Sequence, residues 1–241
     1  MPVDNEWYHD LGDAWWDPDG VVGPLHEINP VRVEYFCGVL GDLVGQRLLE
    51  IGCGGGLMAE EYAKREASVT AVDRSASSIA IAAKHARTSG LKIAYAPSVG
   101  ERLPFNNGSF DAVLSADTLE HVDDVDLVVS EAARVLRPGG RFVYDTVNRT
   151  WKSRLLLVWL PQNVFHIAPP DTHEYARFIK PQELQTIMAR HGLQNCETRG
   201  LALKRNPIAA GISFARTRKL GGFQIGDDTG MSYVGYAEKA A

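Results

Sequence analysis

Between residues 46 and 148, short apolar runs alternate with stretches in which apolar residues recur at helical spacing. The apolar runs predict strands over Arg47–Ile51, Val69–Asp73, Lys92–Ala96, Phe110–Ala116 and Arg141–Thr146. The amphipathic stretches predict helices over Leu57–Lys64, Ser75–Ser89 and Val125–Leu136. Regular alternation of strands and helices is typical of a parallel sheet wound by right-handed crossovers. The central part of the chain is therefore expected to be an α/β core.

The two ends of the chain have a different pattern. Residues 1–45 are rich in Trp, Pro, Asp and His, and we expect them to form an N-terminal cap or lid rather than a core layer. After Arg149 an irregular region precedes a helix near Pro181–His191 and strands near Asn195–Leu203 and Met231–Ala237. We expect a single domain over 1–241: a cap (1–45), a ligand-binding core (46–148) and a substrate-side region (149–241).

Composition narrows the function classes. The formal net charge is −5, so the chain has no overall excess of positive charge to neutralise nucleic-acid phosphates. This argues against a nucleic-acid partner. Cys37, Cys53 and Cys196 form no Cys-x-x-Cys pair, which fits a reducing compartment. The first ten residues lack the features of a signal peptide, and no apolar run reaches roughly 18 residues. We expect a cytoplasmic protein, and the oligomeric state is left open.

The most informative segment is a glycine loop after the first predicted strand, Leu48-Leu-Glu-Ile-Gly-Cys-Gly-Gly-Gly-Leu57. Glycine permits positive φ and close approach of a ligand, and the helix that follows offers unpaired N–H groups. In such sheets ligands bind beyond the carboxyl ends of the strands. A ligand-free turn is one alternative. A dinucleotide loop, Gly-x-Gly-x-x-Gly, is another, and it fits only loosely because position 57 is Leu.

Asp73 ends the second predicted strand, about 20 residues beyond the glycine loop, where an acid can accept both hydroxyls of a ribose. Its alternative role is the N-cap of the helix that begins near Ser75, and both roles can coexist.

The spacing Glu50-x-Gly52-x-Gly54-x-Gly56 resembles motif I of class I S-adenosyl-L-methionine (SAM) methyltransferases. Gly100–Phe105 and Gly108–Val113 resemble the adenine-side motifs of the same class, and Arg137–Gly140 resembles its turn before the fifth strand. The resemblance implies a Rossmann-like fold with a mostly parallel seven-stranded sheet and helices on both faces. Val99 departs from the pattern, because many members carry Asp there. We therefore expect backbone groups near Gly100 and Glu101 to hold the adenine.

Further segments narrow the resemblance. They are Trp15–Asp17, Pro24–Arg32, Gly52–Gly56, Leu119–Val122, Asn148–Arg149, Thr172–His173, Phe178–Pro181 and Asn206–Pro207. Together, from about Asp13 to Tyr236, they resemble the polyprenyl-dihydroxybenzoate and demethylubiquinol O-methyltransferases of ubiquinone biosynthesis. The resemblance implies methyl transfer from SAM to a catechol- or phenol-like hydroxyl of a lipophilic small molecule.

The resemblance also implies a set of SAM-binding residues: Arg32, Glu50, Gly52, Cys53, Gly54, Asp73, Arg74, Gly100, Glu101 and Ala116. The Glu50 carboxylate would orient the sulfonium and ammonium side of the ligand. The guanidinium of Arg32 would bind the SAM carboxylate through two hydrogen bonds, whereas its alternative role is that of an ordinary surface residue on a helix.

Asp117, Glu120 and His121 follow the fourth predicted strand, where an acceptor would meet the methyl donor. Two carboxylates and an imidazole can bind a divalent cation such as Mg²⁺ or Zn²⁺, which would lower the pKa of a bound catechol hydroxyl. The family has Glu where this chain has Asp117, and unrelated enzymes carry Leu-Glu-His here only to brace the helix. The catalytic candidates are His121, His173 and Glu120, with His26 behind them, although each histidine could be merely structural.

The segment Trp151–Pro170 is apolar with few charges, and it could be a substrate lid, a peripheral membrane contact or core. Lys204 and Arg205 depart from the family, which usually has an aromatic residue there, so the acceptor could differ from a quinone precursor. Two other functions stay open: methylation of nitrogen, sulfur or carbon on another scaffold, and SAM or NAD binding without catalysis.

Overall fold

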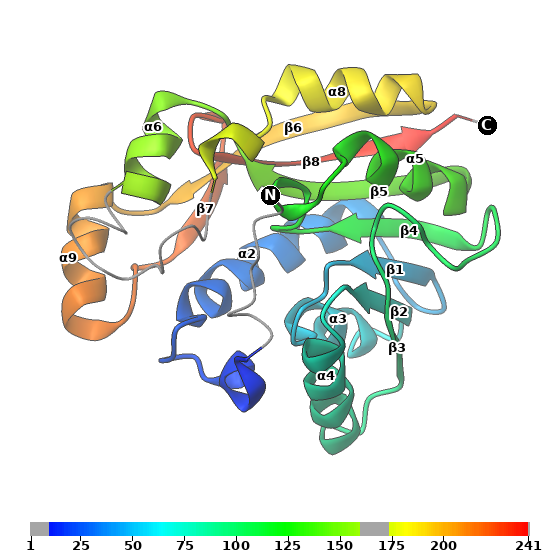
Figure 1. Cartoon of the computed structure of the whole chain (residues 1–241), viewed down its shortest axis with the longest axis horizontal. Coiled ribbons are helices and arrows are strands. Elements are labelled where there is room, and N and C mark those ends of the chain that lie inside the picture. The colour runs from blue at the N-terminus through cyan, green and yellow to red at the C-terminus, as the bar shows by residue number, and fades with distance from the viewer. Residues whose placement is uncertain (1–9, 160–173, 241) are drawn as a thin grey trace.

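The computed structural model describes residues 10–159 and 174–240, and its centre is an eight-stranded sheet (Figure 1). The strand order is β3-β2-β1-β4-β5-β8-β6-β7. The strands are β1 (Arg47–Ile51), β2 (Ser68–Asp73), β3 (Ile93–Pro97), β4 (Phe110–Ser115), β5 (Leu136–Val147), β6 (Leu193–Leu203), β7 (Phe223–Gly226) and β8 (Ser232–Lys239). Strands β1 to β5 pair in parallel, whereas β8, β6 and β7 pair antiparallel.

The prediction of a mostly parallel, seven-stranded sheet is corrected in two respects. The sheet has eight strands among the described residues, and its antiparallel half makes it mixed. The additional strand β7 pairs with the end of β6 from Gly200 to Leu203. It is only four residues long, Phe-Gln-Ile-Gly, which is too short to show a periodic pattern in the sequence.

Helices α3 (Leu57–Ala63), α4 (Ala76–Thr88) and α5 (Val125–Val135) follow β1, β2 and β4, as the pattern predicted. The other described helices are α2 (Gly23–Leu40), α6 (Trp151–Ser153), α8 (Pro181–Arg190) and α9 (Pro207–Thr217). Short turns of other helix types lie at η1 (Gly12–Trp16), η2 (Leu119–His121), η3 (Arg154–Trp159) and η4 (Tyr175–Arg177). Ser75 caps α4 by accepting from the Ser78 N–H, and Asp124 caps α5 by accepting from the Leu127 N–H.

Helices cover both faces of the sheet (Figure 1). On one face α5 and α8 bury their apolar sides against the strands, and on the other face α2, α3 and α4 do so. The central parallel strands β1 and β4 are buried on both faces, so their sequences are mostly apolar. The two buried clusters hold the carboxyl ends of β1, β2 and β4 in fixed positions at one edge of the sheet.

The N-terminal region is not a cap throughout. Helix α2 belongs to the buried cluster that it shares with α3 and α4, where Val33, Phe36 and Leu40 are buried. The expectation that 1–45 stays outside the core is therefore wrong for this helix. Proline is disfavoured inside a helix, and Pro30 lies within α2, so the sequence there did not predict a helix. The turn η1 is different, because it lies against the glycine loop.

The described residues contain no helix long and apolar enough to span a membrane. Of the segment 151–170, only 151–159 is described, and there Trp151 is largely exposed. A peripheral membrane contact through this segment stays a prediction.

Candidate functional site

The glycine loop leaves the carboxyl end of β1 in a conformation that glycine alone adopts readily. Gly52, Gly54 and Gly56 have φ values of 75°, 50° and 85°. A Cβ atom on Gly52 would lie 2.2 Å from Oγ1 of Thr118, so the space for a side chain is absent as well. The Gly52 N–H donates to the carbonyl oxygen of Val72 at 2.8 Å, which ties the loop to the end of β2.

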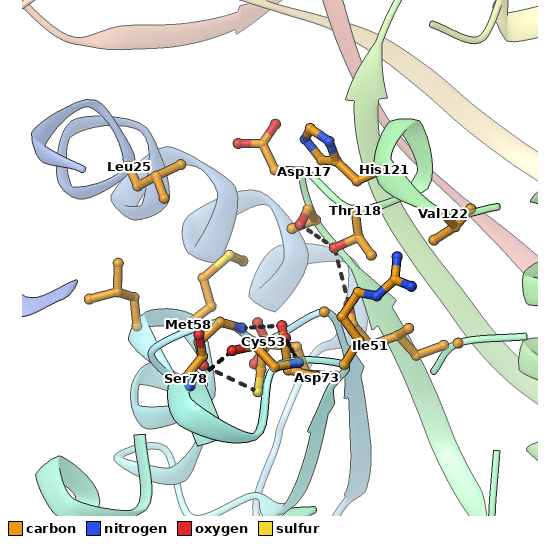
Figure 2. Close-up of a pocket in the computed structure, with 18 of the residues that line it drawn as sticks. Leu25, Ile51, Cys53, Met58, Asp73, Ser78, Asp117, Thr118, His121 and Val122 are labelled. Atoms are coloured by element: carbon orange, nitrogen blue, oxygen red, sulfur yellow. Dashed lines mark hydrogen bonds between the residues drawn. The ribbon is translucent and has the colours of Figure 1, made fainter. Parts of the chain in front are cut away.

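A cavity opens where the loop meets the ends of β1, β2 and β4 (Figure 2). Most of the predicted site residues line it: Arg32, Glu50, Gly52, Cys53, Gly54, Asp73, Arg74, Gly100, Glu101, Ala116, Asp117 and His121. Figure 2 shows Asp73 and Cys53 at one end of the cavity and Asp117 and His121 at the other. Glu120 is not among the lining residues, and His173 lies outside the described residues.

Asp73 holds the glycine loop in place. Its Oδ2 accepts from the Gly54 N–H and its Oδ1 from the Ser75 N–H, both at 2.8 Å. The helix cap considered for Asp73 is provided by Ser75 instead. The carboxylate therefore lies at the junction of loop and cavity, where a ribose hydroxyl can reach it.

The carboxyl group of Glu50 is buried and faces the cavity. The residue is 4% exposed, lines the cavity, and has no hydrogen-bond partner for its Oε2 atom within the described part of the chain. Burial, followed by the nearby Asp73 carboxylate, raises the pKa of Glu50 to about 8. A cationic ligand group would compensate this carboxylate, and SAM carries both a sulfonium and an ammonium. The residues present therefore fit SAM.

Arg32 is the centre of a buried ion-pair network rather than a surface residue. It is 3% exposed, and its Nε donates to Oδ2 of Asp145 on β5. Its Nη2 lies 2.9 Å from Oδ2 of Asp117, and its Nη1 donates to Oδ1 of Asn29 at 3.1 Å. The interpretation of Arg32 as an ordinary surface residue is therefore wrong.

Asp145 was missed by the sequence reasoning. It is 1% exposed, and its Oδ1 accepts from the backbone N–H of Asp117 at 2.6 Å. Burial raises its pKa to about 6, although Arg32 acts in the opposite direction. The available signal was an isolated acid inside the apolar strand Phe142–Val147, where a charge needs a partner.

The three residues predicted to bind a metal ion, Asp117, Glu120 and His121, do not form a metal site in the described structure. In 10–159 and 174–240, no group of three or more His, Cys, Asp or Glu side chains is placed to hold a metal ion. Asp117 pairs with Arg32, and Glu120 is buried with its Oε2 accepting from Thr146 Oγ1 at 2.8 Å. Burial raises the pKa of Glu120 well above its usual range. These donors do not fit a divalent cation in this arrangement.

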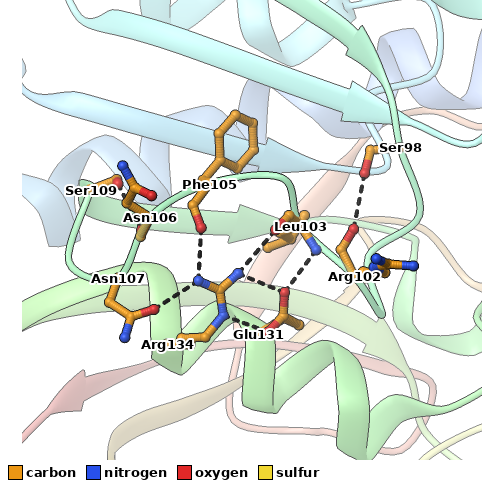
Figure 3. Close-up of polar contacts among 9 residues, drawn as sticks. All are labelled: Ser98, Arg102, Leu103, Phe105, Asn106, Asn107, Ser109, Glu131 and Arg134. Atoms are coloured by element: carbon orange, nitrogen blue, oxygen red, sulfur yellow. Dashed lines mark hydrogen bonds and ion pairs between the residues drawn. The ribbon is translucent and has the colours of Figure 1, made fainter.

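The segment Gly100–Phe105, which we expect to contact adenine, is held by one ion pair on α5 (Figure 3). Glu131 accepts the Leu103 N–H at 2.7 Å and pairs with Arg134 at 2.6 Å. The guanidinium of Arg134 in turn donates to the carbonyl oxygens of Leu103 and Phe105 at 3.0 and 2.7 Å. The pair fixes the chain that continues from Gly100 and Glu101.

Comparisons with known proteins agree with this site. A family model described as a methyltransferase domain matches residues 49–144. A ubiquinone biosynthesis O-methyltransferase of Aromatoleum aromaticum is 34% identical over 240 residues, covering 99% of this chain and 97% of the relative. One of Agrobacterium fabrum is 39% identical over 194 residues, covering 76% and 78%.

A solved structure of a SAM-dependent methyltransferase from Thermotoga maritima, described as a possible histamine N-methyltransferase, aligns with a TM-score of 0.67 at 20% identity. The alignment covers 96% of this chain and 98% of that one, which supports the fold alone. The sequence relatives, the methyltransferase domain and the geometry of the loop agree: the chain is a SAM-dependent methyltransferase and belongs to the ubiquinone biosynthesis O-methyltransferase family.

Proposed function

We propose that this enzyme transfers the methyl group of SAM to a hydroxyl of a catechol- or phenol-like, lipophilic small molecule. The observation that carries the proposal is one continuous cavity with two chemically different ends. Glu50, Asp73 and the glycine loop lie at one end, and Asp117 and His121 lie at the other. Kinship with O-methyltransferases supports oxygen as the acceptor atom.

The donor end would hold SAM through groups of distinct chemistry. Asp73 would accept the ribose hydroxyls, and the Oε2 atom of Glu50 would face the cationic part of the ligand. Gly52 and Gly54 would allow close approach of the ligand to the backbone, and Gly100 and Glu101 would contact the adenine. Cys53, Arg74 and Ala116 complete the proposed wall, and Arg32 would bind the carboxylate of the ligand.

A side chain at the acceptor end would remove the proton of the attacking hydroxyl. SAM supplies the methyl group as an electrophile, so the attacking hydroxyl must lose its proton. A ring nitrogen of His121 is our candidate to accept that proton, because the residue lines the cavity and lies beside Asp117 (Figure 2). Glu120 is not kept as a catalytic residue, because its side chain is buried against Thr146 outside the cavity lining.

The test is methyl transfer from labelled SAM to a panel of catechols and phenols with alkyl chains of increasing length. We expect methylated oxygen product, with kcat/KM rising as the chain lengthens. His121→Gln should lower kcat by about 100-fold or more while leaving SAM binding intact. Products methylated only on nitrogen, sulfur or carbon would refute the proposed acceptor, whereas failure to bind SAM would refute the donor site.

A further inference from the structure

The N-terminal turn η1 presses an aromatic side chain against the glycine loop. A Cβ atom on Gly54 would lie 2.6 Å from Cη2 of Trp15, and one on Gly55 would lie 2.5 Å from its Cγ. The indole of Trp15 is 6% exposed and lines the same cavity as Glu50 and Asp73. Part of the ring thus contacts the loop backbone, while other atoms of the residue contribute to the cavity wall.

The next residue fixes this arrangement. The indole N–H of Trp16 donates to the carbonyl oxygen of Gly55 at 3.1 Å. Its ring stacks on His85 of α4, with 3.4 Å between ring centroids and 6° between planes. His85 is held by Glu60, whose buried Oε1 lies 2.7 Å from its Nδ1. Trp16 is therefore anchored both to the loop and to the helix behind it.

Two further contacts hold the turn from either side. Nε2 of His26 on α2 lies 3.0 Å from the carbonyl oxygen of Trp15, and Nζ of Lys84 on α4 lies 2.8 Å from Oδ1 of Asp13. The segment is thus attached to α2, α4 and the loop at once. These attachments explain why Trp15 has a defined place although it precedes the first strand by more than thirty residues.

We propose that Trp15 is a SAM-binding residue that completes the donor cavity over Gly54 and Gly55, and that Trp16 is the positioning residue that keeps it there. The inference rests on the proposed donor site. The N–H of Gly54 donates to Asp73, and the indole of Trp15 lies against Gly54. A ligand bound beside Asp73 would therefore also contact the indole. A rigid aromatic face next to a cationic ligand also supplies favourable electrostatic and dispersion contacts.

The experiment measures SAM binding by calorimetry and steady-state kinetics for the full chain and four variants. Trp15→Ala should raise both the Kd and the KM for SAM by about tenfold or more, as truncation of a buried aromatic anchor does. Trp15→Phe should raise them by less than about threefold, because an aromatic face remains. Trp16→Phe keeps the stack on His85 but loses the bond to Gly55, and we expect an increase of about threefold.

The fourth variant, Trp151→Ala, removes an exposed indole outside the cavity lining and should leave the Kd for SAM unchanged. In Trp15→Ala, kcat at saturating SAM should stay within about twofold of the wild-type value, since the acceptor end is untouched.

An unchanged Kd in Trp15→Ala would overturn the inference. So would a fall in kcat with an unchanged KM, because that pattern reports a smaller fraction of folded enzyme. If the wild-type chain itself bound no SAM, the proposed donor site would be refuted and this inference with it.

Discussion

The guanidinium of Arg32 on α2 donates its Nε–H to the buried carboxylate of Asp145 on β5. The same carboxylate accepts the backbone N–H of Asp117, which has a left-handed φ of 50° just beyond β4. One buried ion pair therefore joins α2, the segment just beyond β4 and the carboxyl end of β5. Because Arg32 and Asp117 both line the cavity, the pair also sets the shape of the site.

Asp145→Asn should lower both stability and SAM affinity. The amide keeps the size of the side chain, but it leaves Asp117 as the one anionic partner of the buried Arg32 among the described residues. Because the buried guanidinium loses one of its two carboxylate partners, we expect about 2 kcal/mol less free energy of unfolding in urea, and a higher KM for SAM.

The matched control is Asp126→Asn, which weakens an exposed contact with Arg190 and His191. That change should lower the free energy of unfolding by less than about 1 kcal/mol. Equal losses in the two variants would show that Asp145 has no special role.

Gly52→Ala should abolish SAM binding, and its effect can be divided into two parts. Alanine must adopt a φ of 75° and must also push Thr118 Oγ1 away from a Cβ only 2.2 Å distant. Gly45 has a φ of 70°, and a methyl group there would meet no described atom within 4 Å. Gly45→Ala therefore reports the backbone strain alone.

We expect Gly45→Ala to lose about 1 kcal/mol of folding free energy with normal SAM binding. Gly52→Ala should lose clearly more and should give no measurable calorimetric signal with SAM. Similar unfolding curves for the two variants would mean that contact with Thr118 is unimportant.

The pKa of Glu50 gives the SAM-free enzyme a defined pH dependence. Burial raises that pKa from 4.5 to about 8. Between these two pH values the folded state keeps a proton on Glu50 that the unfolded state has released. The stabilisation is complete below pH 4.5 and is lost as the pH rises through 8. Glu50→Gln should remove this part of the pH dependence, up to about 5 kcal/mol.

Urea unfolding at intervals from about pH 5 to pH 8, without SAM, measures the effect. Asp145 and Glu120 also have raised pKa values and contribute in the same direction. Both groups are present in the two proteins, so the difference between wild type and Glu50→Gln belongs to Glu50. Parallel pH curves for the two proteins would contradict a raised pKa at this residue.

The sequence predicted the parallel half of the fold because its strands and helices have uniform, uninterrupted patterns. The glycine loop, Asp73 and the acids after β4 were found because parallel strands bring their carboxyl ends to one edge, so spacing along the chain predicts proximity in space. Motif positions predicted residues from Glu50 to Glu101 that line one cavity, and their role in binding SAM stays a prediction.

What the sequence did not reveal depends on contacts between distant segments. Asp145 pairs with a residue 113 positions earlier, and Trp15 covers glycines that follow it by about forty positions. No local pattern encodes either contact. The metal set shows the opposite case: Asp117, Glu120 and His121 are close in sequence, but in the structure Arg32 and Thr146 bind the two carboxylates.

Arg134→Met should weaken SAM binding from a position outside the cavity. The guanidinium holds the adenine-side segment by donating to the carbonyl oxygens of Leu103 and Phe105 and by pairing with Glu131 (Figure 3). Methionine keeps much of the side-chain volume but provides none of these hydrogen bonds. The segment from Gly100 onward should become more mobile, and we expect the KM for SAM to rise by about fivefold with little change in kcat.

Arg190→Met is the control for loss of a surface arginine, because Arg190 pairs with Asp126 on the outside of α5. It should leave the KM for SAM unchanged. Hydrogen exchange adds a direct readout, since the Leu103 amide, which donates to Glu131, should lose protection in Arg134→Met and keep it in Arg190→Met. Unchanged protection at Leu103 would show that this ion pair does not order the adenine side of the site.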